Sequence, residues 1–271
     1  MKNNYSGDDW DKIVRTLDDT KREELWRAHL QWIYAELFDR WGVNSQDGLT
    51  LKTDLYDEAI TTHNLMSFLG RRSERVVGTD ISLEVARAAK RRMAKEWDSR
   101  NRVVVSDIRN LAFRSECCSQ ILSNSTLDHF PHTRDIVRSL KEIHRILKPG
   151  GTLVITLDNP ANPLIFLRNR LPYRLLRFFG IIPFYMGRTL SRTELARVLE
   201  ANGFKVQEHT SIVHSPRIVA IWLGYMIEKT GSNHTKSGFR KLLQLFERLE
   251  SFPVKDLTGY FVAAKAIKTG V

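Results

Sequence analysis

The chain has 271 residues and a formal net charge of +11, with 42% hydrophobic and 27% charged side chains. This length allows a full hydrophobic core. Because no Pro/Gly/Ser-rich linker divides the chain, we expect one elaborated globular domain over residues 1–271 rather than two. The two cysteines, Cys117 and Cys118, are adjacent in sequence, which excludes a disulfide framework and is typical of a reducing cytoplasm.

Helical spacing dominates the N-terminal part of the chain. Apolar and aromatic side chains recur near helical intervals over residues 8–40, which predicts one helix or two. The first residues are polar, so we expect no signal peptide. We interpret residues 1–45 as an N-terminal helical extension that covers the sheet, a ligand cleft or a second subunit.

After this extension come apolar runs, each of which ends in a few polar residues. Strands are predicted at residues 49–53, 76–80, 103–107, 120–124 and 152–157. Helices are predicted between them, at residues 57–69, 82–96 and 134–147. The last of these helices is followed by Lys148-Pro149-Gly150-Gly151, where proline cannot continue a helix and glycine supplies the reversal.

The C-terminal part departs from this alternation before returning to it. Over residues 159–190, aromatic and aliphatic side chains interleave with arginines. Ser191-Arg192-Thr193-Glu194 is a capping box and predicts a helix to about residue 201. A strand is expected at residues 204–215, two helical patterns within 216–253, and a last strand at 257–267.

This order predicts an α/β fold with a doubly wound, Rossmann-like sheet. We expect the sheet to be mostly parallel with an antiparallel last strand, and to carry the N-terminal helices and helical insertions. The core that binds a ligand is assigned to residues 46–158, and substrate or lid insertions to 159–190 and 216–253. Polar residues gather at the carboxyl ends of the strands, which is where such folds bind ligands.

The first predicted strand lacks the glycine-rich turn that usually follows it in nucleotide-binding folds. No glycine occurs between Gly48 and Gly70. Asp57 and Glu58 stand instead at the expected start of the next helix, where they suit the helix dipole and occupy the place of a bound anion. This argues against a phosphate-bearing dinucleotide, and therefore against an NAD-dependent oxidoreductase.

The ordered set of Asp80, Asp107, Asn124 and Lys148-Pro149-Gly150-Gly151 resembles class I S-adenosylmethionine-dependent methyltransferases, over residues 49–268. The resemblance implies S-adenosyl-L-methionine as cofactor, and no metal site is predicted. It also implies that the acid ending the second strand binds the ribose diol and that the acid ending the third accepts from the adenine amino group. By position in this sequence, the implied cofactor-binding residues are Asp80, Ile81, Asp107, Ile108, Ser123, Asn124 and Ser125.

Lys52, Thr53 and Asp54 stand where the family normally carries its first motif, and two registers are open. If Lys52 replaces the usual strand-ending acid, the inverted charge disfavours the ammonium group of the cofactor but suits its carboxylate. If Asp54 replaces it, an acid is kept two residues later. We favour Asp54, because residues 49, 51 and 53 alternate as strand positions and aspartate tolerates left-handed backbone. The competing interpretation is a degenerate pocket whose residues only cap the next helix.

If the cofactor binds, the reaction is displacement at the sulfonium methyl, in which alignment and exclusion of water supply much of the catalysis. His129 is our candidate general base, although a capping or packing histidine is the commoner role. His132, His214 and Tyr185 are weaker candidates. The insertions predict a small or lipophilic acceptor, and we interpret residues 159–188 as its lid rather than as a packed hairpin or a membrane contact.

The basic charge leaves other partners open. We expect a cytoplasmic protein, with membrane-surface contact and a homodimer as further possibilities. Nucleic acid is the minority hypothesis, because no zinc-finger spacing or RNA-binding signature accompanies the dispersed positive charge. The alternatives to an enzyme are an altered methyltransferase-fold protein that acts by interaction, and a basic peripheral binder of membranes or nucleic acid.

Overall fold

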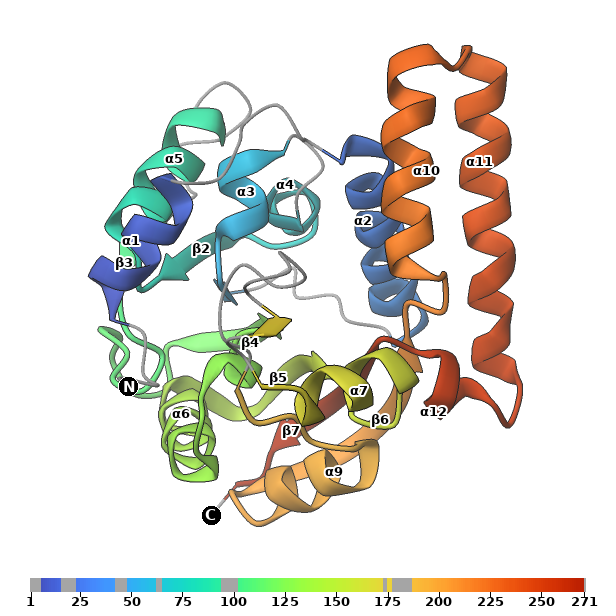
Figure 1. Cartoon of the computed structure of the whole chain (residues 1–271). Coiled ribbons are helices and arrows are strands. Elements are labelled where there is room, and N and C mark those ends of the chain that lie inside the picture. The colour runs from blue at the N-terminus through green and yellow to red at the C-terminus, as the bar shows by residue number, and fades with distance from the viewer. Residues whose placement is uncertain are drawn as a thin grey trace.

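The computed structural model describes residues 6–15, 23–41, 48–61, 65–93, 102–172, 175–176 and 187–270. Seven strands form a single sheet in the order β3-β2-β1-β4-β5-β7-β6 (Figure 1). The strands are β1 Leu49–Thr53, β2 Arg75–Asp80, β3 Arg102–Val105, β4 Cys118–Asn124, β5 Leu147–Asp158, β6 Phe204–Ile212 and β7 Phe261–Lys268. The strands β1 to β5 pair in parallel, and β7 runs antiparallel to both β5 and β6, as the sequence predicts.

Helices cover both faces of this sheet. The helices are α1 Gly7–Arg15, α2 Glu24–Arg40, α3 Tyr56–Ile60, α4 Leu65–Gly70, α5 Leu83–Met93, α6 Thr133–Ile146, α7 Pro163–Arg170, α9 Arg192–Glu200, α10 Arg217–Thr230, α11 Asn233–Phe246 and α12 Lys255–Thr258, with 3-10 turns η1 Leu127–His129 and η2 Glu247–Ser251. Figure 1 shows α10 and α11 as a hairpin that projects beside α2.

The core is divided by the sheet into two layers because successive strand residues point to opposite faces. Leu122 and Val154 pack with α2, α4 and α5 on one side, whereas Ile121 and Leu153 pack with α6 and α9 on the other. The strands are apolar on both faces for this reason, which is typical of a parallel sheet buried between helices. The predicted doubly wound α/β class is therefore confirmed.

The predicted helix over residues 57–69 is instead two short helices. Helix α3 ends at Ile60, where Thr61 is extended with φ −131° and ψ 158°. Helix α4 begins at Leu65, and the carboxylate of Glu58 accepts a hydrogen bond from the Met66 amide at 3.2 Å. The side chain of Glu58 thus turns inward, satisfies an amide in the first turn of α4, and separates the two helices.

Several strand boundaries also differ from the sequence expectation. Strand β5 begins at Leu147 rather than at 152, and β3 ends at Val105 rather than at 107. Strand β6 ends at Ile212 rather than at residue 215, because Val213 has a left-handed backbone with φ +63° and turns the chain. Strand β7 begins at Phe261 rather than at 257, since residues 255–258 form the helical turn α12.

The capping box at Ser191 is present, with Ser191 N donating to Glu194 Oε2 at 2.8 Å.

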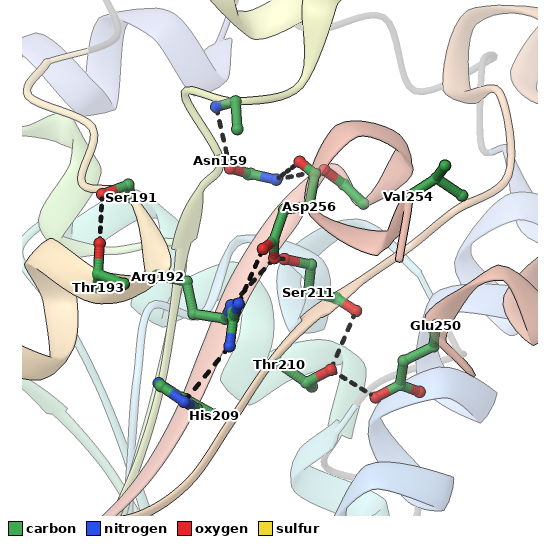
Figure 2. A network of polar contacts seen from close by, with 12 residues as sticks. Asn159, Ser191, Arg192, Thr193, His209, Thr210, Ser211, Glu250, Val254 and Asp256 are labelled. Carbon is green, nitrogen blue, oxygen red and sulfur yellow. Dashed lines mark hydrogen bonds and ion pairs between the residues drawn. The ribbon is translucent and has the colours of Figure 1, made fainter. Parts of the chain in front are cut away.

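A polar network fixes α12 against the edge of the sheet (Figure 2). The Arg192 guanidinium donates to both carboxylate oxygens of Asp256, at 3.0 and 2.9 Å, and Ser211 Oγ donates to Asp256 Oδ1 at 2.8 Å. Asn159, at the end of β5, donates from Nδ2 to the Asp256 carbonyl oxygen at 2.7 Å. These bonds hold α12 beside the carboxyl end of β5.

The close packing of Leu55 against Gly78 on β2 gives a stability prediction. A Cβ atom at Gly78 would lie 2.5 Å from Leu55 Cδ2, and Leu55 is fully buried. We expect Gly78→Ala to lower the free energy of unfolding by about 1–3 kcal/mol through overpacking. Gly238→Ala on α11 is the matched control, because nothing lies within 4 Å of its Cβ position; it should be neutral or stabilising by up to about 1 kcal/mol. Chemical denaturation measures both, and equal effects at the two sites would contradict the packing argument.

Candidate functional site

The order of the sheet reverses between β1 and β4, which places a crevice site at the carboxyl ends of the central strands. The register pairs Thr53 with Thr79 on one side and with Ser123 on the other. The loops after β1, β2 and β4 therefore start at the same level of the sheet. The segments predicted to bind a cofactor all begin there.

Asp54 takes the backbone conformation that a glycine would normally supply. Its φ is +68°, and its Oδ1 accepts a hydrogen bond from the Tyr56 amide at 2.8 Å. Aspartate tolerates this left-handed conformation because its short carboxylate can bond to the local backbone. The turn after β1 thus keeps a glycine-like shape without glycine.

Lys52 is buried beneath this turn together with Glu58. Its Nζ donates to Glu58 Oε2 at 3.0 Å and to the carbonyl oxygen of Asp54, and the two charged side chains are 1% and 0% exposed. Burial alone would lower the pKa of Lys52, but the neighbouring carboxylates, Glu58 first, outweigh it and raise that pKa. The ammonium charge is therefore balanced inside the protein, which leaves Asp54 as the polar side chain of this turn nearer to the cleft.

Asp80, at the end of β2, accepts two backbone hydrogen bonds. Leu55 N donates to its Oδ2 and Ser82 N to its Oδ1, both at 2.8 Å. Burial raises the pKa of Asp80, and burial together with the Asp80 charge raises the pKa of Asp54 well above its usual value. Two partly buried acids thus lie close together at the ends of β1 and β2, where a cationic ligand would relieve their repulsion.

Asp107, after β3, is held by a neighbouring arginine. Arg109 donates from Nε and Nη2 to the two carboxylate oxygens, with Nη2–Oδ2 at 2.6 Å, and stacks over the Phe130 ring at 5.0 Å. Burial raises the pKa of Asp107, but these bonds outweigh it and lower the pKa overall. An adenine amino group at this position would share the carboxylate with Arg109. Ile108, which follows, is buried.

The end of β4 carries the remaining predicted cofactor contacts. Ser123 is fully buried and accepts from Thr53 Oγ1 at 3.1 Å. Asn124 is 8% exposed, and its Oδ1 has no hydrogen-bond partner among the residues that the structure describes. Ser125 has a left-handed backbone, with φ +47°, and donates from Oγ to Asp128 Oδ2 at 2.9 Å. Left-handed backbone at both Asp54 and Ser125 marks the two central loops as a strained, ligand-site geometry.

Asp128 is a buried acid directly behind this loop. Its Oδ2 also accepts from the Asp158 amide at 2.9 Å, whereas its buried Oδ1 has no partner within the described part of the chain. Burial, followed by the charge of Asp158, raises the pKa of Asp128 to about 7. Asp158 in turn accepts from Arg168 Nη1 at 2.5 Å.

His129, the candidate base, lies in the turn η1 next to Asp128. Burial lowers its pKa to about 4, so the ring is neutral at neutral pH and is a weak base. Its ring packs edge-on against Trp10 with centroids 5.0 Å apart. The catalytic role of His129 stays a prediction.

The structure gives little support to the three weaker candidates for the general base. His214 is buried and held by Thr258 Oγ1 at 2.7 Å and the Ser211 carbonyl oxygen at 2.9 Å, which is a structural environment. His132 lies just before α6. Tyr185 lies outside the described residues, as does most of the predicted lid over 159–188 beyond α7.

Helix α1 lies across the loops of the site. Asp11 Oδ1 accepts from Ser82 Oγ and from the Glu84 amide, the latter at 3.1 Å, and so caps α5 from a distance in sequence. Gly7 approaches so closely that a Cβ there would lie 2.6 Å from the Ile81 carbonyl oxygen. With the Trp10 contact to His129, α1 bridges the loops after β2 and β4. Part of the N-terminal extension therefore covers the site.

Several site residues were not singled out from the sequence. Asp158 ends β5 in the same manner as Asp80 ends β2, so the strand-end pattern could have identified it. Asp128 directly precedes His129 in sequence, so it could have been considered together with that histidine. Glu58 was noted only as a helix-start acid, and Asp11 had no local signal, because its partners lie more than 70 residues away. Among the described residues no cluster of His, Cys, Asp or Glu could hold a metal ion.

Residues 59–155 match the family model described as methyltransferase domain. This segment contains β2 to β4 and most of β5, with the loops that follow Asp80, Asp107 and Asn124. This part of the chain is therefore similar to a methyltransferase domain. The match starts directly after Glu58, so the atypical turn after β1 lies outside it.

Other proteins resemble this chain at low sequence identity. Ribosomal RNA small subunit methyltransferase I of Mesorhizobium japonicum is 28% identical over 119 residues, which is 44% of this chain and 38% of that protein. The matched segment thus spans well under half of this curated relative.

Solved structures share the fold. Haemonchus contortus phosphoethanolamine N-methyltransferase 2, in complex with phosphomonomethylethanolamine and S-adenosylhomocysteine, has a TM-score of 0.60 at 18% identity and covers 100% of this chain and 62% of its own. Geranyl diphosphate C-methyltransferase from Streptomyces coelicolor A3(2) has a TM-score of 0.52 at 17% identity, over 84% of this chain and 74% of its own. A sarcosine dimethylglycine methyltransferase assigned in Galdieria sulphuraria has a TM-score of 0.55 at 13% identity, over 88% and 84%.

The buried ion pair of Lys52 and Glu58 beneath the turn after β1 gives a second prediction. Lys52→Met leaves the Glu58 carboxylate buried without its counter-charge, so we expect the free energy of unfolding to fall by about 3–5 kcal/mol. The double variant Lys52→Met/Glu58→Gln removes both charges and keeps an acceptor for the Met66 amide, so it should regain most of that loss. Urea denaturation measures all three proteins. A double variant no more stable than the single one would show that charge burial is not the cause.

The raised pKa of Asp128 gives a pH prediction. Because its folded pKa of about 7 lies above its ordinary value of 3.8, ionisation costs stability, and this cost grows as the pH rises from about 4 to 7. Asp128→Asn cannot ionise, so its stability relative to the native chain should increase over that interval, by roughly 2–4 kcal/mol, and then level off.

Asp107→Asn is the control of opposite sign. Its native carboxylate has a lowered pKa and stabilises the fold above the ordinary value, so the deficit of this variant should disappear as the pH falls. Denaturation curves from roughly pH 2 to 8 give both differences, since the Asp107 contribution is lost only below its ordinary pKa of 3.8. A difference for Asp128→Asn that does not change with pH would contradict the assignment.

Proposed function

We propose that this protein transfers a methyl group from S-adenosyl-L-methionine to a small or lipophilic acceptor. The observation that carries the proposal is the convergence of Asp54, Asp80 and Asn124 on one crevice at the switch point of the sheet. The crystal structures of neighbours that share this fold contain S-adenosylmethionine or S-adenosylhomocysteine in several cases. In this chain the proposal rests on the donor and acceptor groups at the strand ends.

The residues present fit such a cofactor in kind. The buried Oδ1 of Asn124 needs a donor, and an ammonium or hydroxyl group of the cofactor would provide one. The paired acids at Asp54 and Asp80 favour a ligand with positive charge, and Asp80 suits a ribose diol because a carboxylate accepts from two hydroxyls. Ile81 and Ile108 flank these positions with apolar surface. Of the two acids at the start of α3, Glu58 is buried with Lys52 and Asp57 is paired with Arg27, so the argument from sequence against a phosphate-bearing nucleotide is weakened.

The cofactor supplies an electrophilic methyl group when it is bound. The protein would then orient the acceptor in line with that methyl and exclude water from it. Ser125 and Asp128 hold the loop after β4 in one conformation, and His129 lies on that loop in its neutral form, from which it can accept a proton. Asp128, with a pKa of about 7, is a second group that can hold or release a proton near neutral pH.

The acceptor would approach from the side of α7 and α10. There Arg168 is paired with Asp158, and the Arg217 guanidinium lies over the Tyr260 ring at 4.7 Å. An aromatic ring, apolar helix surface and two guanidinium groups suit a lipophilic molecule with a polar or anionic end. Two neighbours of the same fold are named for phosphoethanolamine and geranyl diphosphate, which agrees with this chemistry.

The alternative is a methyltransferase-fold protein that has lost catalysis and acts by interaction. The first turn without glycine is the feature that favours it. Ribosomal RNA as acceptor has support only from the curated relative over part of its length. Cofactor binding separates the catalytic proposal from the interaction proposal most directly.

Calorimetry with S-adenosylhomocysteine tests this proposal. We expect saturable binding by the folded protein, and about tenfold to hundredfold weaker binding by Asp80→Asn, because hydrogen bonds to a charged group contribute about 1.5–3 kcal/mol. Asp39→Asn is the matched control, since Asp39 lies on the exposed end of α2, paired with Arg72. No detectable binding at millimolar ligand would overturn the enzyme proposal. Unchanged affinity in Asp80→Asn would refute only the assignment of the ribose site.

A further inference from the structure

Large apolar side chains are exposed on three elements around the acceptor side of the molecule. We call these elements, α7, the segment η2–α12, and the first part of α10, the apolar–basic face. Their apolar members are each between 41% and 64% exposed, and they are Leu164, Phe166, Leu167, Ile218, Val219, Trp222, Phe252, Val254 and Leu257. Exposed apolar residues scattered singly are ordinary, but a group of nine on neighbouring elements indicates an interaction surface.

Hydrogen bonds hold the three elements next to one another. Asn162, the N-cap of α7, donates from Nδ2 to the Thr258 carbonyl oxygen in α12 at 3.1 Å. Asn159 Nδ2 donates to the Gly259 carbonyl oxygen at 2.9 Å. Tyr260, the next residue, lies under the guanidinium of Arg217 at the start of α10. Figure 1 shows α7 and α12 side by side in the lower half of the view, below the lower end of α10, and Figure 2 shows the bonds that anchor α12.

Three acids of this region are neutralised by arginines. Asp158 pairs with Arg168, Asp256 with Arg192, and Glu250 with Arg40. Glu247 is only partly exposed, accepts from Ser215 Oγ and lies beside His29.

Two bases of the face, in contrast, have no ion pair with any residue that the structure describes. Arg170 lies over the Phe166 ring at 3.7 Å, and Lys255 lies between Val254 and Leu257 in sequence. Cationic side chains next to exposed aromatic and aliphatic ones are the composition of helices that lie in a membrane interface.

We propose that the apolar–basic face seats the protein on the surface of an anionic lipid bilayer. The apolar tips would enter the boundary between headgroups and acyl chains, and the free bases would lie among anionic headgroups. Attachment is peripheral, as no helix in the described part of the chain is long and apolar enough to cross a membrane. The proposal stands independently of methyl transfer, although it would bring a lipid-like acceptor to the side of Arg168 and Arg217.

Charge favours this occupant over two others. A second copy of the chain would bring one basic face against another, and the total charge of +11 adds to that repulsion. A nucleic acid would neutralise the bases but leave the apolar tips of Ile218, Trp222 and Leu257 without an apolar partner. An anionic bilayer satisfies both kinds of group.

Flotation of the full chain with lipid vesicles tests the proposal. We expect binding to phosphatidylcholine vesicles that contain about one third phosphatidylglycerol, and at least about tenfold weaker binding to pure phosphatidylcholine or at high salt. The variant Ile218→Ser/Trp222→Ser/Leu257→Ser replaces three apolar side chains that are each more than half exposed, so the protein should still fold. Its binding to vesicles should be weaker by about tenfold or more. Arg170→Gln/Lys255→Gln should weaken binding to anionic vesicles alone.

Matched controls lie at the opposite edge of the sheet. Val105→Ser on β3 removes another exposed apolar side chain, and Lys90→Gln/Arg91→Gln on α5 removes other bases; both should bind vesicles as the native chain does. Equal binding by the triple serine variant and the native chain would overturn the proposal, and so would equal binding to both lipid compositions. A native dimer that the serine variant converts to a monomer, with no vesicle binding, would reassign the face to self-association. Binding of RNA but not of vesicles would also overturn it.

Discussion

The ammonium of Lys52 lies at the carboxyl end of the central strand with 1% of its side chain exposed, so its charge has to be met within the protein. Glu58 neutralises this charge. It can do so because α3 begins so soon after β1 that the Glu58 side chain reaches back to Lys52. The same carboxylate accepts the Met66 amide at the start of α4, and the same ammonium donates to the Asp54 carbonyl. One ion pair thus sets the position of two helices and of the turn that faces the crevice. Without it, isolated charges would remain in a medium where burial is costly.

This arrangement explains how a methyltransferase fold accommodates a first motif without glycines. Two properties of glycine matter in such a turn, namely positive φ and the absence of a side chain near the ligand. Asp54 supplies the first, and the Leu55 side chain is directed into the core against Gly78 and Met66, away from the crevice. Close packing requires a glycine on β2 instead, because any side chain at Gly78 would collide with Leu55. The substitution of acids for glycines changes the electrostatics of the crevice more than its backbone.

Much of the fold could be predicted from the sequence because it depends on local patterns. Apolar runs that end in Asp80 and Asn124, and the capping box at Ser191, each reflect interactions over a few residues. The interruption of the helix at Thr61 could not be predicted, since it depends on Glu58 turning toward Lys52 and Met66. The positive φ of Val213 also has no signal in its type, because β-branched residues rarely adopt it. In the candidate site, the strand-end acids were accessible to pattern reasoning, whereas the pairing of Asp107 with Arg109 is a matter of side-chain geometry.

Helix α1 is the first element of the chain, yet its contacts in the site are with residues that follow much later. Asp11 is separated by 71 and 73 residues from its two partners in the loop after β2. Contacts of such long range are slow to form, because the ends of a long loop must meet before any bond rewards them. Helix α1 precedes every strand of the sheet in sequence, so its bonds to the loop after β2 form only after that loop has been synthesised. We therefore expect α1 to dock onto the site after the strands that carry its partners have formed.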